Sequence, residues 1–213
     1  MDRLLIFVIK LLTYYYITFT IYTSSYMRRL FMEKEKILIN SAEMHAIIER
    51  MTFQIIEKVN DYDNTYIVGI RRRGEYIANR IIDSINRHNK RPLKSGILDI
   101  TLYRDDLSEI SNMPEVKSSD IGFDVNGKTI IVVDDVLFTG RTIRSAIDAL
   151  LDYGRPAKIM LAVIVDRGHK ELPIHADFTG KHIPTRKSEV IHVKVKEIDN
   201  VDDDCVTISD REA

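Results

Sequence analysis

The sequence predicts an α/β fold in which helices flank a mainly parallel central sheet. Runs of β-branched and other apolar residues at 65–70, 129–133 and 158–165 alternate with segments of helical periodicity, a pattern typical of βαβ units. A chain of 213 residues is long enough for one substantial domain of this class, with little room for a second. We therefore expect one sheet, covered on both faces.

The first predicted elements are a helix, a strand and a second helix. Apolar residues from Ser41 onward recur at helical spacing, with Ser41 as the expected N-cap: Met44, Ile47, Ile48, Met51, Ile55, Ile56 and Val59. Residues 65–70, "TYIVGI", predict a strand. The following "RRRG" predicts a loop, and residues 75–87 predict a helix.

The second half of the chain repeats this alternation after a long polar interruption. Residues 97–103, "ILDITLY", alternate as a strand does, and about 25 residues without periodicity follow. Loops of that length are usually functional lids or disordered. Residues 129–133 then predict a strand and 141–153 a helix that ends before Gly154 and Pro156. Residues 158–165, "KIMLAVIV", predict a further strand.

Composition and charge limit the classes of function. Apolar residues make up 45% of the chain and charged residues 30%, the usual balance of a globular protein. The single cysteine, Cys205, excludes an intramolecular disulfide and a multi-cysteine metal site. It predicts a reducing, cytoplasmic compartment. Beyond residue 31, 27 basic and 31 acidic residues give a net charge of −4, which argues against general nucleic-acid binding and against DNA as a partner.

The first 31 residues differ from the rest of the chain. Residues 4–22 are apolar and aromatic apart from Lys10 and three threonines, and the run approaches the length that spans a bilayer. A membrane anchor, a disordered extension and a start codon set upstream of Met32 are the alternatives. We favour a true start at Met32, so the expected organisation is an extension at 1–31 and one domain at 32–213, with the membrane not a partner.

Three polar loops follow the predicted strands, and this arrangement predicts the ligand site. They are Arg71–Gly74, Asp134–Thr142 and Asp166–Lys170. In a parallel sheet the ligand lies beyond the carboxyl ends of the strands. We therefore expect the three loops to converge on one crevice.

The loop "DDVLFTGRT" combines two carboxylates with features that bind an anion. Asp134 and Asp135 end a buried strand, where unpaired carboxylates are costly. The start of the next helix directs backbone N–H groups to the same place, and Gly140 allows close approach. A sugar phosphate fits, with its diol on the acids. The chain has neither a Walker A nor a G-x-G-x-x-G motif. A receiver domain would carry its acids after an early strand, and mere helix capping is the remaining alternative.

The segment "VVDDVLFTGRT" resembles the phosphoribosyl-diphosphate (PRPP) motif of type I phosphoribosyltransferases. "DITLYRDDLS", "GRPAKIMLAVIVDRGHKELPIHADFTGKHIPT" and "KSE" resemble one subfamily, the bifunctional pyrimidine operon attenuation regulators and uracil phosphoribosyltransferases. The resemblance extends over residues 36–206. It implies the type I phosphoribosyltransferase fold, with a small hood beside the central sheet and a flexible lid loop.

The resemblance also implies the residues of the site. Asp134, Asp135 and Arg104 would be catalytic, and Arg167 and Ile191 would bind uracil. Mg²⁺ would come with PRPP, with no protein ligand assigned to it. The positions implied for PRPP are Arg72, Arg73, Arg104, Asp134, Asp135, Val136, Leu137, Phe138, Thr139, Gly140, Arg141 and Thr142.

The implied reaction is the transfer of a phosphoribosyl group to uracil, with UMP and diphosphate as products. Its transition state should resemble an oxocarbenium ion, which positioning and charge stabilisation can favour. A lid would keep out water as a competing nucleophile. Purine-salvage relatives have an acid directly before "TG", whereas Phe138 stands there in this chain. A pyrimidine is therefore the expected base.

The resemblance implies a second activity, the binding of pyrimidine operon leader mRNA in response to the uridine nucleotides UMP and UTP. The candidate RNA-binding residues are Arg50, His169 and Lys170. Glu49 and Phe53 depart from the family pattern, and Lys170 lacks the fork of an arginine. A salvage enzyme without RNA binding and a catalytically inactive, UMP-sensing RNA-binding regulator are the alternatives. Relatives also imply a homodimer or a larger homo-oligomer.

Overall fold

The computed structural model describes residues 35–89, 92–104 and 118–210. The expected extension at 1–31 and most of the expected lid loop lie outside these ranges. Among the described residues, no helix is long and apolar enough to cross a bilayer.

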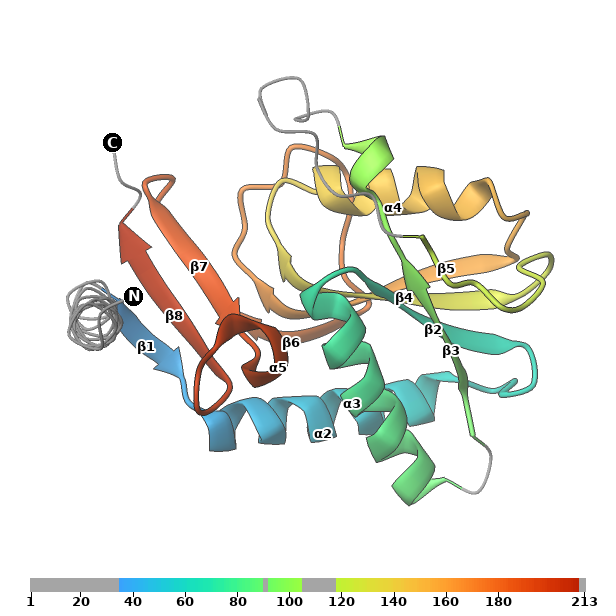
Figure 1. Cartoon of the computed structure of the whole chain (residues 1–213), viewed down its shortest axis with the longest axis horizontal. Helices are drawn as coiled ribbons and strands as arrows, with labels where there is room; N and C mark the ends of the chain where they lie inside the picture. The colour runs from blue at the N-terminus through green and yellow to red at the C-terminus, as the bar shows by residue number, and fades with distance from the viewer. Residues whose placement is uncertain (1–34, 90–91, 105–117, 211–213) are drawn as a thin grey trace, which may run out of the picture.

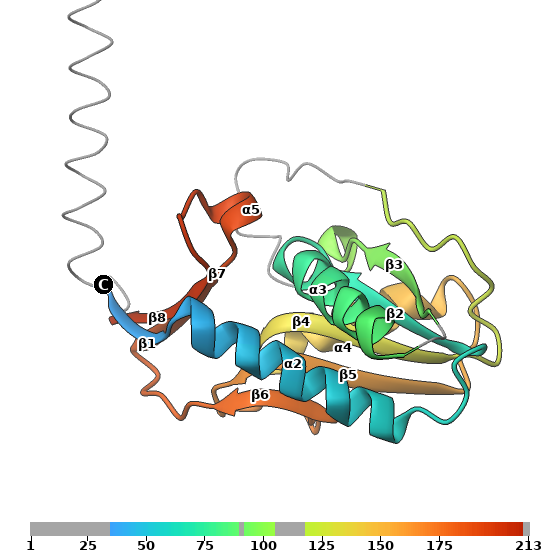
Figure 2. The ribbon, with the colours of Figure 1, turned by 90° about the horizontal axis from the view of Figure 1, so that it is seen from below.

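A five-stranded parallel sheet in the order β3-β2-β4-β5-β6 forms the centre of the molecule (Figure 1). Helices α2 and α3 cover one face and α4 covers the other (Figures 1 and 2). The predicted α/β class and parallel sheet are confirmed. The elements are α2 (Ser41–Lys58), β2 (Thr65–Ile70), α3 (Arg73–His88), β3 (Lys94–Leu98), the 3₁₀ turn η1 (Thr101–Tyr103), β4 (Thr129–Leu137), α4 (Arg141–Leu151), β5 (Lys158–Asp166) and β6 (Phe178–His182).

The sheet divides the buried side chains into two apolar layers. Successive side chains of a strand point to opposite faces, so Ile131 and Val133 of β4 pack with α2 and α3. Ile130 and Val132 pack with α4 on the other face. Burial on both faces explains the continuous apolar runs that the sequence shows at these strands.

A smaller antiparallel sheet forms the hood beside the main sheet. Its strands, in the order β1-β8-β7, are β1 (Lys36–Ile39), β7 (Glu189–Lys194) and β8 (Cys205–Asp210). The short helix α5 (Lys196–Asp199) connects β7 to β8. Buried residues of β7 and β8 belong to the same apolar cluster as α2 and α3. In the part of the chain that the structure describes, the hood therefore has no separate core.

Two predicted boundaries are wrong for local reasons. Asn40, not Ser41, caps α2: its side chain accepts a hydrogen bond from the Glu43 N–H, and the Glu43 carboxylate accepts one from the Asn40 N–H. The strand expected at 97–103 is β3, which ends at Leu98. The Asp99 side chain then accepts a hydrogen bond from the Thr101 N–H at 2.8 Å, and this local bond starts the turn η1 in place of a strand.

Two further boundaries matter for the site. Helix α3 begins at Arg73 rather than Glu75, so Arg73 belongs to the first helical turn. Strand β4 continues through the two aspartates to Leu137, because its pairing with β5 extends to the pair of Leu137 with Asp166. Its pairing with β2 stops at Val133. Asp134 and Asp135 thus lie inside a strand that is paired on only one side.

Candidate functional site

The three predicted loops converge at the carboxyl ends of β2, β4 and β5, which are neighbours in the sheet. Arg73, after β2, has its Nη1 3.8 Å from Oδ2 of Asp135 on β4. Arg167, after β5, donates its backbone N–H to the Leu137 carbonyl at 3.1 Å. Its guanidinium carbon lies 3.9 Å from the centre of the Phe138 ring. The expected convergence of the three loops is therefore confirmed.

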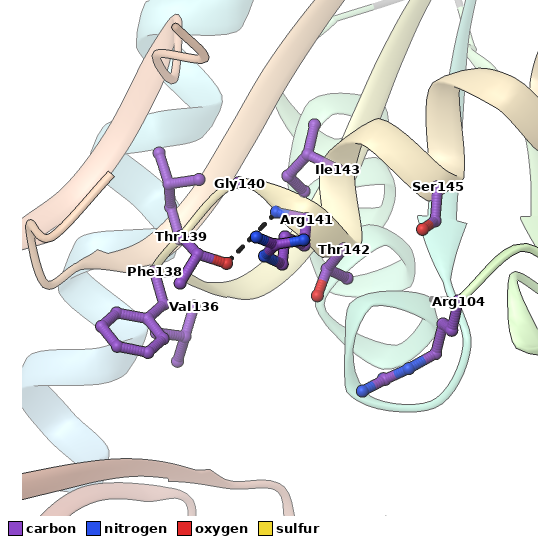
Figure 3. A pocket seen from close by; sticks show the side chains of 10 residues that line it. Arg104, Val136, Phe138, Thr139, Gly140, Arg141, Thr142, Ile143 and Ser145 are labelled. Atoms are coloured by element: carbon purple, nitrogen blue, oxygen red, sulfur yellow. Dashed lines mark hydrogen bonds between the residues drawn. The ribbon is translucent and has the colours of Figure 1, made fainter. Parts of the chain in front are cut away.

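A cavity of about 380 Å³ lies where β4 turns into α4 (Figure 3). Its lining combines the N-terminal turn of α4 with two threonines and two arginines, a set of donors suited to an anion. The lining residues are Arg104, Val136, Leu137, Phe138, Thr139, Gly140, Arg141, Thr142, Ile143 and Ser145. Residues 136–142, which the resemblance implied for PRPP, thus all line one cavity.

Gly140 shapes the turn of this loop. Its φ of 92° is in the left-handed region that glycine adopts without strain. Backbone N–H groups of Glu171 and Leu172 donate to the Thr139 carbonyl at 2.9 and 3.2 Å and hold the loop from outside. The Arg141 side chain also lines the cavity and forms an ion pair with Glu171, 2.9 Å between Nε and Oε2. Glu171 therefore offsets part of the positive charge that Arg141 brings to the cavity.

Arg104 reaches the cavity from the other side of the crevice. It directly follows η1, and the Ser145 hydroxyl of α4 donates to the neighbouring Tyr103 carbonyl at 3.0 Å. The Tyr103 hydroxyl also donates to the carboxylate of Asp152, just after α4. Figure 3 shows the Arg104 side chain extending toward the side on which Thr142 lies. Ser145 is 4% exposed, and nothing in the sequence pattern had marked it.

The two aspartates form a buried acidic pair. Asp134 is 6% exposed and the Asp135 side chain 22%. The Asp135 N–H donates to Asp134 Oδ1 at 2.9 Å, and the Val136 N–H donates to Asp135 Oδ1 at 2.8 Å. Burial raises the pKa of both carboxyls, and the neighbouring Asp135 charge adds to the rise at Asp134. At Asp135 the positive charge of Arg73 opposes the rise in pKa. Such a pair is suited to accept hydrogen bonds from ligand hydroxyls.

The three arginines of "GIRRRG" have different environments. Arg72 is exposed at the N-cap of α3, and the Arg71–Arg72 peptide bond is cis. Arg73 is half-buried and makes a two-pronged ion pair with Asp199 of α5, at 2.9 and 2.6 Å. Arg71 is held by backbone carbonyls. Its N–H donates to the Leu98 carbonyl at 3.0 Å and its guanidinium to the Ser118 carbonyl at 3.3 Å.

Arg167 lies between the loops and the hood. It is 6% exposed. Its guanidinium donates to Thr185 Oγ1 at 3.1 Å and to the Glu189 carbonyl of β7 at 2.6 Å, and it lies over the Phe138 ring. Ile191 is buried two residues further along β7. The structure therefore joins Arg167 to the hood through Glu189, a partner that the sequence did not indicate.

The three candidate RNA-binding residues lie around β6 but have intramolecular partners. Arg50 donates to the Gly180 carbonyl. The His169 ring lies 2.6 Å from the Thr185 carbonyl, and Lys170 Nζ lies 2.9 Å from the carboxylate of Asp166. His169 also packs edge-on against Phe138, 5.8 Å between ring centres. His169 thus belongs to the Phe138 side of the crevice, whereas Arg50 and Lys170 lie at the edge of the sheet.

Glu49 reduces the positive charge of the neighbouring helix surface. Its carboxylate accepts hydrogen bonds from Ser84 at 2.8 Å and Arg87 at 2.7 Å, and lies 3.1 Å from the His88 ring. Two basic side chains of α3 are thereby paired with an acid of α2. The departure from the family pattern at Glu49 has a structural reason, a link between the two helices.

No group of three or more His, Cys, Asp or Glu residues within the described ranges is arranged to hold a metal ion. The acidic pair supplies carboxylate oxygens, the hard donors that Mg²⁺ prefers. Mg²⁺ commonly keeps several waters and binds through few carboxylates together with substrate phosphates. The site thus fits a Mg²⁺ ion that a phosphate ligand carries with it.

Comparison with known proteins agrees with this geometry. The family model described as "Phosphoribosyl transferase domain" matches residues 36–198. The chain is 53% identical over 169 residues to a protein named "Bifunctional protein PyrR" from Elusimicrobium minutum, covering 79% of this chain and 94% of that protein. A protein of the same name from Thermus thermophilus is 51% identical over 165 residues, covering 78% and 91%.

Solved structures show the same fold at low sequence identity. A hypoxanthine phosphoribosyltransferase from Staphylococcus aureus superposes with a TM-score of 0.60 at 17% identity, over 83% of this chain and 92% of that one. This likeness concerns the fold alone. The family match and the two relatives together confirm the resemblance inferred from the motifs. The chain belongs to the phosphoribosyl transferase domain family and, within it, to the family of bifunctional PyrR proteins.

Proposed function

We propose that the protein is a uracil phosphoribosyltransferase that converts uracil and PRPP to UMP and diphosphate. The observation that carries the proposal is the order of three features along one crevice. An anion cavity at the N-terminus of α4 adjoins a buried acidic pair, and Arg167 with Phe138 follows on the hood side. The ligand with this order of groups is a 5-phosphoribosyl unit carrying a base.

Each part of the crevice has a distinct role in the proposal. The 5′-phosphate would bind the N–H groups and hydroxyls of residues 137–142, and the ribose hydroxyls would donate to Asp134 and Asp135. Arg72, Arg73 and Arg104 would receive the diphosphate. Mg²⁺ bound with PRPP would neutralise part of the charge of the leaving diphosphate. Because the acidic pair faces the ribose, its negative charge favours the positive charge that develops there.

The transfer forms a bond between the anomeric carbon and N1 of uracil, breaks the bond to the diphosphate oxygen, and releases the N1 proton. The buried Arg167 donors would fix a carbonyl of the base. Phe138 offers an apolar ring where an acid would accept a hydrogen bond from a purine. The base pocket thus favours a small ring with carbonyl acceptors.

A panel of bases tests this function. With PRPP and Mg²⁺ we expect product from uracil, and none from orotate, hypoxanthine or guanine, in a chromatographic assay of nucleotide formation. The orotate carboxylate would be a further buried charge, which is costly without a partner. Product from hypoxanthine or guanine would overturn the assignment of the base pocket, even if uracil also reacts.

We also propose that the protein binds pyrimidine operon leader mRNA when UMP occupies the site. The name of the relatives, "Bifunctional protein PyrR", supports a second activity. Arg50 on α2 and Lys170 after β5 are far apart in the sequence, yet both lie beside β6, through Gly180 and through Asp166, which pairs with His182. Exposed Lys181 and His182 add basic groups to the same strand.

Leader-RNA binding is expected to tighten with UMP and to weaken steeply with salt, because contacts to phosphates release counterions. A gel-shift titration at two salt concentrations, with and without UMP, measures both effects. The variant Arg50→Gln should bind RNA more weakly. Its matched control is Lys58→Gln, at the end of the same helix, which should bind RNA as the wild type does. The absence of a UMP-dependent shift would leave the salvage enzyme without RNA binding. A shift without turnover would support the inactive, UMP-sensing regulator.

A cytoplasmic location, a homodimer or larger homo-oligomer, and the organisation into an extension at 1–31 and a domain at 32–213 remain parts of the proposal. The start of the family match at residue 36 supports the domain boundary.

A further inference from the structure

Two arginines of α3 hold the hood against the main sheet. Arg73 and Arg80 are seven residues apart and thus lie on the same side of the helix. Arg80 pairs with Glu197 and with Asp204, each at 2.7 Å. Arg73 pairs with Asp199, which follows Glu197 by two residues in α5. The acids all come from the segment that joins β7 to β8.

The two ion pairs differ in what else the arginine contacts. Arg80 has both its acidic partners in the hood connection. Arg73 also faces the acidic pair of the crevice, with Nη1 3.8 Å from Asp135 Oδ2. Arg80 can therefore act only as a link between α3 and the hood. Arg73 is both a link and a part of the candidate site.

The contact with Asp199 fixes the orientation of the Arg73 guanidinium. Its Nε lies 2.9 Å from Asp199 Oδ2 and its Nη2 lies 2.6 Å from Oδ1. This two-pronged geometry sets the plane of the guanidinium as well as its distance. One edge of the guanidinium is occupied by Asp199, so the Nη1 side is turned toward Asp135.

Asp199 is itself well held. Its Oδ2 also accepts the Val195 N–H at 2.8 Å, and its side chain is 15% exposed. Burial is the largest single effect and raises the pKa of its carboxyl. The hydrogen bonds from Arg73 and the Val195 N–H, together with the charges of Arg73 and Lys194, outweigh it, so the net direction is down. Asp199 is therefore a fixed, ionised anchor rather than a surface acid that pairs by chance.

We propose that Asp199 is a positioning residue for diphosphate recognition, acting through Arg73. By holding the Nε and Nη2 edge, Asp199 presents the Nη1 edge of Arg73 to the place where the diphosphate of PRPP leaves. The proposal rests on the proposed phosphoribosyl transfer. It requires that PRPP and diphosphate, but not UMP, depend on Asp199, because UMP has no group at that position.

The variant Asp199→Asn tests this selectivity. It keeps the size of the side chain and the acceptor for Val195 but removes the charge that holds the guanidinium. We expect the KM for PRPP, and the KM for diphosphate in the reverse reaction, to rise about tenfold. The KM for uracil and the Kd for UMP should stay within about twofold of the wild type.

The matched control is Glu197→Gln, which removes one charge from the same helix α5 but contacts Arg80 instead of Arg73. Each variant weakens an ion pair between α3 and α5. The melting temperatures of the two variants measure how much stability each change removes. Glu197→Gln should leave the KM for PRPP unchanged. If Asp199→Asn weakens UMP by the same factor as PRPP, or if Glu197→Gln raises the KM for PRPP equally, Asp199 is only structural and the proposal is wrong.

Calorimetric titration separates this proposal from the proposed function. The Kd values for PRPP and UMP, measured with Mg²⁺ and without a base, need no turnover. If the wild type binds PRPP but does not use uracil, the proposed reaction is wrong. The effect of Asp199→Asn on the Kd for PRPP can still be measured in that case. If PRPP binds equally well to Asp199→Asn and the wild type, the positioning role is wrong whatever the reaction.

Discussion

Replacement of Asp135 by asparagine is expected to lower the rate of UMP formation about 10²–10³-fold. The carboxylate of Asp135 lies between the Val136 N–H and the Arg73 guanidinium, beside the proposed position of the ribose. Asparagine keeps an acceptor for Val136 but loses the negative charge that favours a cationic transition state. Steady-state assays at saturating PRPP and uracil measure the loss in kcat.

The control for this change is Asp177→Asn, at the surface, where Asp177 pairs with Lys58 at 2.9 Å. It should retain full activity. RNA binding at saturating UMP should also survive in Asp135→Asn, because Arg50 and Lys170 lie at the edge of the sheet. Activity within about tenfold of the wild type would contradict the role of Asp135.

The same variant should be more stable than the wild type without ligand. Burial raises the pKa of both aspartates in the folded protein, so folding favours their protonated forms. The resulting stability is fully present below the pKa of the unfolded chain and is lost as the pH rises through the folded pKa. At pH 7–8 Asp135→Asn avoids this loss, so its free energy of unfolding should exceed that of the wild type by about 1 kcal/mol. The difference in melting temperature should shrink as the pH falls toward 4.

Replacement of Arg167 by lysine is expected to lower kcat/KM for uracil about 100-fold. The guanidinium contacts Thr185, the Glu189 carbonyl and the face of Phe138 at once. A lysine ammonium cannot reproduce this planar set of contacts. Because the phosphate cavity and the acidic pair do not depend on these contacts, the Kd for PRPP should stay within about threefold.

Arg186→Lys is the matched control, since its side chain is 83% exposed and only its backbone carbonyl faces Arg167, at 3.4 Å. It should behave as the wild type. An equal loss of PRPP affinity in Arg167→Lys would mean that the variant distorts the whole crevice. An unchanged KM for uracil would remove Arg167 from the base pocket.

The sequence predicted the sheet and most of the crevice because both depend on local patterns. The apolar runs of β2, β4 and β5 reflect burial on both faces, and the carboxyl ends of parallel strands necessarily meet at one edge. The motif around Asp134 and Gly140 combines strand, turn and helix start within a few residues. Its chemistry could therefore be inferred without knowledge of the rest of the fold.

The hood and its contacts could not be predicted in the same way. Asp199 is 126 residues from Arg73 in the chain and lies in an acidic segment that reads as solvated surface. Glu189 contributes a backbone carbonyl to Arg167, and a carbonyl has no sequence signal. The short strands of the hood derive their stability from packing on α2 and from pairing across the chain, which no local periodicity records.

The described residues of the hood share their core with the helices of the main sheet, and this limits how the hood can move. Val193 and Val206 of the hood sheet share one apolar cluster with Met51 and Ile77 of the two helices. To swing the hood away from the sheet would expose that cluster to water at a large free-energy cost. The hood side of the proposed base site should consequently stay in place during the reaction. The two sheets should lose their structure in a single cooperative transition rather than as two independently melting parts.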